Sequence, residues 1–173
     1  MTTKECSPTG QTFLALAEHE AQDVTRRTLH AREAMCEAHH YPKPSAFSRG
    51  MEVVLPGARL VFVSGTASVG PKGETLYAGD FRAQSRQAFK NVRAVLRSAG
   101  ADWPDVVKVT VFLKEMQRDY AAFNEVRCAF FLEAGLKVYP ASTCVEARLC
   151  REELLVEMEA LAVFTDDRER RGR

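Results

Sequence analysis

Two glutamates that alternate along an apolar segment are the side chains here most suited to acid–base chemistry. Glu157 and Glu159 lie within the segment 154–164, where Val156 precedes Glu157 and Met158 separates the two glutamates. Because a strand points alternate side chains to the same side, both carboxylates are predicted to face one way. A buried carboxylate costs several kcal/mol unless it is paired or hydrogen-bonded. We therefore expect this sheet face to meet another subunit, with a polar pocket at the seam. The alternative is a structural ion pair with an arginine, for Glu159 more readily than for Glu157.

The cysteines and histidines do not show the patterns of a metal site or a disulfide framework. The cysteines are odd in number and form no CxxC pair, and the histidines all lie near the N-terminus. Metal ligands must converge from elements that the fold brings together. We therefore expect no metal and a reducing, cytoplasmic compartment. These residues are Cys6, Cys36, Cys128, Cys144, Cys150, His19, His30, His39 and His40.

The overall charge argues against a nucleic-acid partner. Lys and Arg total 24 and Asp and Glu total 23, so the chain lacks the basic field that phosphate backbones attract. No apolar run approaches about 18 residues, which predicts no membrane span. The first ten residues, MTTKECSPTG, contain no apolar core of a signal peptide.

The N-terminal part has the spacing of a helix from residue 11 to 38. Its apolar positions recur at three and four residues, but most are small, so packing must hold the helix in place. We expect it to pack as an arm on the main domain or a neighbouring subunit, or else to cover a site as a lid. Tyr41–Pro44 should end it. The stripe is Phe13, Ala17, Ala21, Val24, Thr28, Ala31, Met35 and Ala38.

Strands and helices then alternate along the rest of the chain. Asp80 is predicted to cap a helix that ends near Gly100, and Asp119 a second helix that ends near Gly135. The order β-β-α-β-α-β-β, with both helices on one face, predicts an α+β domain of two layers. The chain thus divides into a helical extension (1–43), this domain (44–164) and a disordered tail (165–173). The expected strands are 51–55, 60–63, 106–113, 143–147 and 154–164.

Several segments, in order along the chain, match the motifs of one family. They are Arg59–Gly65, Gly79–Gln84 with Asn91 and Val92, Asp105–Leu113, Tyr120–Asn124 with Phe130 and Phe131, and Val156–Ala162. In these segments the chain resembles the Rid (YjgF) family of imine and enamine deaminases, over roughly residues 44–164. The N-terminal helix and the tail lie outside the resemblance.

The resemblance implies a chorismate-mutase-like fold and a homotrimer that binds a small molecule in clefts between subunits. The implied activity is cofactor-free hydrolysis of reactive enamines and imines, with release of ammonia. By register, Glu157 takes the place of the glutamate that orients the attacking water. Asn124 matches an asparagine that hydrogen-bonds near the pocket, and Gly65 a glycine whose backbone lies against the ligand. Cys144 matches a pocket-side cysteine, and we interpret it as a small buried apolar residue before a nucleophile.

Two departures affect the binding of an amino-acid-like substrate. The deaminating branch carries a Pro-x-Arg-Ser/Thr motif whose arginine grips the substrate carboxylate as a fork. Here the segment 139–144 reads Tyr-Pro-Ala-Ser-Thr-Cys, so that Ser142 stands in the arginine's place. Phe47 stands where the family has a tyrosine.

Two explanations of the missing arginine remain open. Another arginine can enter the cleft, with Arg148 as the first candidate and Arg49 and Arg127 behind it. Alternatively the ligand lacks a carboxylate there, and the pocket suits a larger or more apolar molecule; we slightly favour this second explanation.

Three functions follow from these observations. The first is a cofactor-free hydrolase of the Rid type that acts on an enamine, an imine or a related small conjugated metabolite. In it, Glu157 orients water while Gly65, Asn124, Ser142 and Thr143 hold the ligand. The second is a non-catalytic trimer that binds a small molecule. The third, a ribonuclease, is disfavoured by the balanced charge, since the one basic cluster is at residues 168–173.

Overall fold

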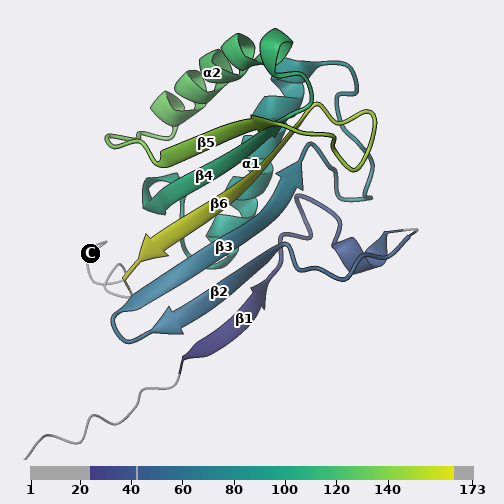
Figure 1. Cartoon of the computed structure of the whole chain (residues 1–173). Coiled ribbons are helices and arrows are strands. Elements are labelled where there is room, and N and C mark those ends of the chain that lie inside the picture. The colour runs from purple at the N-terminus through teal and green to yellow at the C-terminus, as the bar shows by residue number, and fades with distance from the viewer. Residues whose placement is uncertain (1–23, 42, 166–173) are drawn as a thin grey trace, which may run out of the picture.

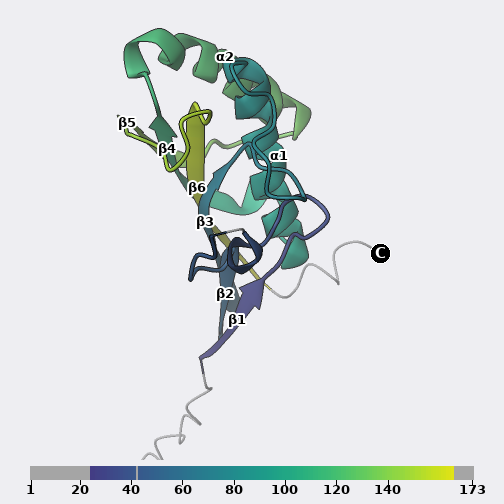
Figure 2. The ribbon, with the colours of Figure 1, turned by 90° about the vertical axis from the view of Figure 1, so that its right-hand side faces the viewer.

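One mixed sheet of six strands carries two helices on a single face (Figures 1 and 2). The structure, a computed structural model, describes residues 24–41 and 43–165. The elements in chain order are β1 (Thr25–Leu29), β2 (Gly50–Leu55), β3 (Ala58–Ala67), α1 (Phe81–Ser98), β4 (Val106–Leu113), α2 (Met116–Glu133), β5 (Ala141–Glu146) and β6 (Val156–Phe164). Two short 3-10 turns lie at Ala38–His40 and Trp103–Asp105. The predicted α+β class is confirmed.

The strand order β1-β2-β3-β6-β4-β5 places the last strand in the middle of the sheet. β4 and β5 are parallel, joined by the crossover through α2, and the other neighbours are antiparallel. β6 therefore pairs with both β3 and β4. This central position explains why Val156–Phe164 is apolar on one face and half-apolar on the other.

The alternation in β6 separates the two faces of the sheet. Met158, Ala160 and Ala162 are buried beneath the helices. Glu157 is half-buried and Glu159 exposed on the opposite face, which none of the described helices or strands covers. Both carboxylates thus lie on one side, as the alternation predicts.

The two helices begin for different reasons. Asp80 caps α1 by accepting a hydrogen bond from the Ala83 amide at 3.0 Å, which confirms that prediction. The prediction that Asp119 caps α2 is wrong, because this helix begins one turn earlier, after Glu115. The amide of Met116 donates instead to the carboxylate of Glu146 at the end of β5, at 2.9 Å. A contact between distant elements therefore sets this helix start.

Aromatic rings fill the space between the helices and the sheet. Trp103 is fully buried, and its ring centre lies 5.3 Å from that of Phe89 and 5.3 Å from that of Phe131. Phe89 also stacks on Phe130 at 4.9 Å and on Phe123 at 5.8 Å. This cluster fixes α2 over β4, and so positions the helix residues of the candidate site.

The helix predicted for residues 11–38 is wrong wherever the structure describes it. Residues 25–29 instead form strand β1, at the edge of the sheet against β2. The weak stripe of small residues gives a helix little to bury, whereas the strand gains main-chain bonds to β2 and the ion pair of Arg27 with buried Glu52. Residues 11–23 lie outside the described part. The division of the chain at residue 44 stays a prediction, and residues 166–173 of the predicted tail lie outside the described part.

Within residues 24–41 and 43–165, no helix combines the length and apolarity that a bilayer crossing requires.

Candidate functional site

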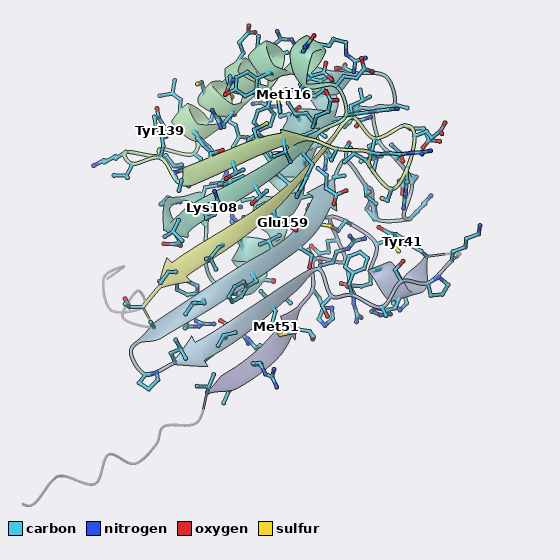
Figure 3. All side chains as sticks on the ribbon, in the orientation of Figure 1. Tyr41, Met51, Lys108, Met116, Tyr139 and Glu159 are labelled. Atoms are coloured by element: carbon cyan, nitrogen blue, oxygen red, sulfur yellow. The ribbon has the colours of Figure 1, made fainter. Side chains whose placement is uncertain are left out.

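A cavity of about 860 Å³ lies where the ends of β3 and β6 meet the loops around residues 41–49 and 150–154. Glu157 and Glu159 line it from β6, and Gly65 lines it from β3. In Figure 3, Glu159 lies on the sheet face turned to the viewer and Tyr41 in the loop beyond the strand ends. The cavity therefore combines a rigid strand carrying two carboxylates with a wall of loops.

A bulge in β3 places Gly65 directly against Glu157. Between Val63 and Thr66 the pairing with β6 shifts, so that β3 holds one more residue than its partner. A Cβ built on Gly65 would overlap Oε1 of Glu157 and lie 3.1 Å from its Cδ. Only a glycine at this position leaves the carboxylate in its observed place.

The surroundings of Glu157 raise the pKa of its carboxyl group, so the group holds its proton more tightly than a glutamate in solvent. Burial raises the pKa of this carboxyl above its usual range, and the nearby charge of Glu159 raises it further, while the charge of Arg49 lowers it. Among the described residues neither glutamate forms an ion pair, so the structural-pair alternative for Glu159 finds no support there. A partly buried carboxylate with a raised pKa is suited to accept a proton from water.

Arg49 and Arg151 hold the aromatic wall of this cavity. Arg49 is buried, and it donates from Nε at 2.9 Å to the Cys36 carbonyl and from Nη2 to the Tyr41 hydroxyl. The Tyr41 ring lies 5.3 Å from the Arg49 guanidinium and 5.0 Å from that of Arg151. Arg151 in turn donates to the Gly73 carbonyl at 2.7 Å. These bonds order the loops, and two arginines thus line the cavity that contains Glu157.

A second group of predicted residues lies beneath α2, at the β5 edge of the sheet. Ser142 and Cys144 pair with buried Val109 and Val111, so both side chains point to the helix side. Arg127 of α2 donates to the Ser142 hydroxyl at 3.2 Å and to the side-chain oxygen of Asn124. Burial raises the pKa of the Cys144 thiol, which the Arg127 charge partly offsets. A raised thiol pKa does not favour a nucleophile.

One chain therefore brings together some of the predicted site residues and separates others. Phe47, Gly65 and Glu157 line the cavity. Asn124, Ser142 and Cys144 form the group beneath α2. The other two predicted site residues, Thr143 and Arg148, belong to neither group.

Thr143 and Arg148 occupy different surroundings. Thr143 faces the open side of the sheet, where its hydroxyl accepts a hydrogen bond from Lys108. Arg148 is exposed and follows the end of β5. The structure gives Arg148 no contact with the cavity or with Ser142.

Several residues of the cavity wall carry no signal in the sequence. The sequence predicts Tyr41 only as part of the segment that ends a helix, and no pattern distinguishes Arg151. Both come from loops whose course depends on contacts with Gly73 and Cys36, and no local pattern encodes such a course. The sequence makes Arg49 a candidate only behind Arg148. Its position two residues after Phe47 is a clue, since both residues lie just before β2.

Comparison with known proteins assigns the family. The family model described as Endoribonuclease L-PSP matches residues 41–164. The chain belongs to this family, which is the Rid (YjgF) family predicted from the sequence motifs.

Its relatives carry two kinds of name. A RutC family protein of Pyrococcus abyssi is 36% identical over 122 residues, which cover 70% of this chain and 89% of that protein. The 2-iminobutanoate/2-iminopropanoate deaminase of Salmonella typhimurium is 39% identical over 104 residues, covering 60% of this chain and 79% of that protein.

Solved structures agree with the fold. A crystal structure of Escherichia coli TdcF with bound serine shares 30% identity and a TM-score of 0.66, covering 80% of this chain and 99% of that one. The Escherichia coli YjgF gene product shares 34% identity and a TM-score of 0.64, covering 79% of this chain and 98% of that one. The predicted fold of this family is confirmed.

Proposed function

We propose that this chain is a cofactor-free hydrolase of the Rid type, which converts the C=N group of an enamine-derived or imine substrate to a carbonyl and releases ammonia. Water adds to the imine carbon, and the C–N bond then breaks as the nitrogen gains protons. Overall, one imine and one water give one carbonyl compound and one ammonia. The observation that carries this proposal is the half-buried carboxylate of Glu157, held by the Gly65 bulge at the wall of a cavity.

Glu157 has the properties that this reaction requires. Its carboxylate can accept a hydrogen bond from a water and then its proton, as the water oxygen attacks the imine carbon. Its raised pKa makes it a stronger base than an exposed glutamate. Because the carboxylate lies on a central strand, it is held by the sheet on both sides. Such positioning supplies much of the rate in a reaction without a cofactor.

A subunit interface is part of the proposal, because one chain separates the two groups of site residues. The group around Glu157 lies on the open face of the sheet, and the group around Ser142 lies on its helix side. The open face carries exposed Phe62 and Val163, and β5 is an exposed edge strand. An exposed apolar face and an unpaired edge strand are both surfaces on which another chain can pack or pair. In a homotrimer of cytoplasmic subunits, Glu157 of one copy would face Asn124 and Ser142 of the next, with the small-molecule ligand between them.

A non-catalytic trimer that binds a small molecule is the alternative. The replacement of the motif arginine by Ser142 favours it, and the TdcF structure holds serine, a ligand with a carboxylate and an amine. A ribonuclease, the activity in the family model's description, is disfavoured by the net charge of +1.

Substitution of Glu157 tests the proposal. Glu157→Gln keeps the size of the side chain but cannot accept the proton of water, so ammonia release from a panel of 2-imino acids generated in situ should fall at least a hundredfold. The mass of the assembly should stay that of the wild type, and the melting temperature should not fall below the wild-type value. Arg97→Ala, which removes an exposed arginine paired with Asp102, a residue that belongs to neither group, is the matched control. Turnover that is unchanged in the Gln variant would contradict the proposal, and ligands that stabilise the wild type without being consumed would favour the alternative.

A further inference from the structure

Arg127 differs from every other arginine on the two helices. The arginines of α1 and α2 at positions 82, 86, 93, 97 and 118 each pair with a carboxylate. Arg127 instead contacts three neutral groups: the Ser142 hydroxyl, the Asn124 side-chain oxygen and the ring of Phe123, 5.6 Å from its guanidinium. Among the described residues no anion compensates its charge. A guanidinium that is held in place but not neutralised has the properties of a binding group for an external anion.

The contacts also fix the direction of the guanidinium. One terminal nitrogen donates to Ser142 and the other to Asn124, so the planar group spans the gap between β5 and α2. Two of its five N–H groups are used in this way, and the others remain available for a ligand. Because the fork is already ordered by its neighbours, little conformational freedom is lost when an anion binds.

The position of the Arg127 guanidinium compensates for the missing motif arginine at position 142. Ser142 occupies the place of the motif arginine, and a serine hydroxyl is short and uncharged. Here the hydroxyl accepts a hydrogen bond from Arg127, which reaches the same point from the helix. The positive charge that Ser142 does not provide on β5 is therefore provided by Arg127 on α2.

Arg49 is the rival for the same role, and its contacts argue against it. Arg49 is only 3% exposed, and two of its nitrogens are bonded to the Cys36 carbonyl, with Nη2 also bonded to the Tyr41 hydroxyl. Its charge also lies close enough to lower the pKa of Glu157. Arg49 thus orders the cavity wall from a buried position, whereas Arg127 is partly exposed and keeps three N–H groups without a partner among the described residues.

We propose that Arg127 is the specificity-determining residue that binds the carboxylate of a 2-imino acid, in place of the arginine that Ser142 replaces. The inference rests on the proposed function for the identity of the reacting group. The ligand carboxylate would take two N–H groups of Arg127 as a fork, and the adjacent imine carbon would face Glu157 of the neighbouring subunit. The substrate then carries an anion next to its C=N bond, contrary to the ligand without a carboxylate that the sequence slightly favours.

Binding of an unreactive product tests this inference separately from turnover. The probe is 2-oxobutanoate, and its methyl ester is the uncharged comparison, both titrated against the intact assembly by calorimetry or NMR. Arg127→Gln should weaken binding of the acid about tenfold or more, as expected for the loss of a charge-assisted pair, and leave the ester unchanged. Arg127→Gln combined with Ser142→Arg should regain affinity for the acid, and Arg97→Ala should bind both probes as the wild type does.

The outcomes separate the two proposals. Wild-type protein that does not bind 2-oxobutanoate, or an Arg127→Gln variant that keeps its affinity or loses acid and ester equally, would overturn the inference. No recovery in the double variant, with the assembly and melting temperature intact, would do the same. If instead Glu157→Gln leaves ammonia release unchanged while Arg127→Gln weakens binding of the acid, the proposed hydrolysis fails and the binding role of Arg127 stands.

Discussion

Gly65 and Glu157 are in contact across β3 and β6, and the contact leaves no room for a methyl group at position 65. A Cβ there would overlap Oε1 of the glutamate, which must then rotate away. The backbone of Gly65 is not in the left-handed region, so the clash, and not backbone strain, decides the effect of a substitution.

Gly65→Ala is therefore expected to remove activity without unfolding the protein. Displacing a catalytic group by about 1 Å can cost a hundredfold in rate, and we expect a loss of ten- to a hundredfold in kcat. The melting temperature should change little, since the displaced atoms are the flexible end of a side chain. Steady-state ammonia release and thermal unfolding measure the two effects.

Gly70→Ala is the matched control for this prediction. Its Cβ would meet the carboxylate of Glu74 at 2.5 Å, a similar collision that lies outside the lining of the Glu157 cavity. This variant should keep its turnover. Equal losses of kcat in the two variants would show that the Gly65 contact has no special role.

The pH dependence of turnover should report the surroundings of Glu157. Activity needs the ionised carboxylate, so the rate should rise with pH through the raised pKa of Glu157. Glu159→Gln removes one of the causes that raise this pKa, and the acidic limb of the kcat profile should move to lower pH. A limb that stays in place would show that Glu157 does not control the rate in this range.

The same shift has a consequence for stability. Because the folded-state pKa of Glu157 is raised, its contribution to stability is fully present below the unfolded-state pKa and is lost as pH rises through the folded-state pKa. At neutral pH the wild type therefore holds a destabilising charge that Glu157→Gln lacks. This explains why the Gln variant should melt no lower than the wild type, with a difference that shrinks toward acidic pH.

Because Glu52 is buried, the stability of the protein should depend more on its partner Arg59 than on its partner Arg27. Its carboxylate is fully buried between Arg27 of β1 and Arg59 of β3. The Arg59 side chain is 20% exposed and that of Arg27 is 57% exposed. Arg59→Ala should cost about 3 kcal/mol, because it removes the more buried partner of a buried charge. Arg27→Ala should cost about 1 kcal/mol or less.

Chemical denaturation of the two variants measures this difference. Arg59→Met, which keeps an apolar stem near the ring of Phe164, separates the loss of packing from the loss of charge. A larger cost for Arg27→Ala than for Arg59→Ala would contradict the assignment of Arg59 as the main partner of Glu52.

The sequence predicted the elements whose signals are local. Asp80 and the spacing that follows it gave the start of α1, and the alternation around Glu157 and Glu159 gave the faces of β6. The start of α2 was misplaced because Asp119 resembles a cap, whereas the helix begins where its first amide meets Glu146. The edge strand β1 was missed because it is stabilised by β2 and Glu52 and not by its own residues.

The candidate site was predictable to the same extent. Glu157 and Gly65 belong to strands, and the cavity includes both of them. The partners of Ser142 were not predictable, since the approach of Arg127 depends on how α2 packs over the aromatic cluster. A contact between two helix residues that are four positions apart can be predicted from their spacing. A contact between a helix residue and a strand residue cannot.

The burial of Trp103 gives the protein an internal optical reporter. It is the chain's single tryptophan, fully enclosed beside Phe89 and Phe131, and its indole nitrogen has no hydrogen-bond partner among the described residues. Its emission should therefore lie at short wavelength in the native protein and shift to the red only when α2 leaves the sheet. Because the Trp103 ring does not line the cavity, a bound ligand should leave its fluorescence unchanged. In a ligand titration, this fluorescence therefore reports whether the core remains intact.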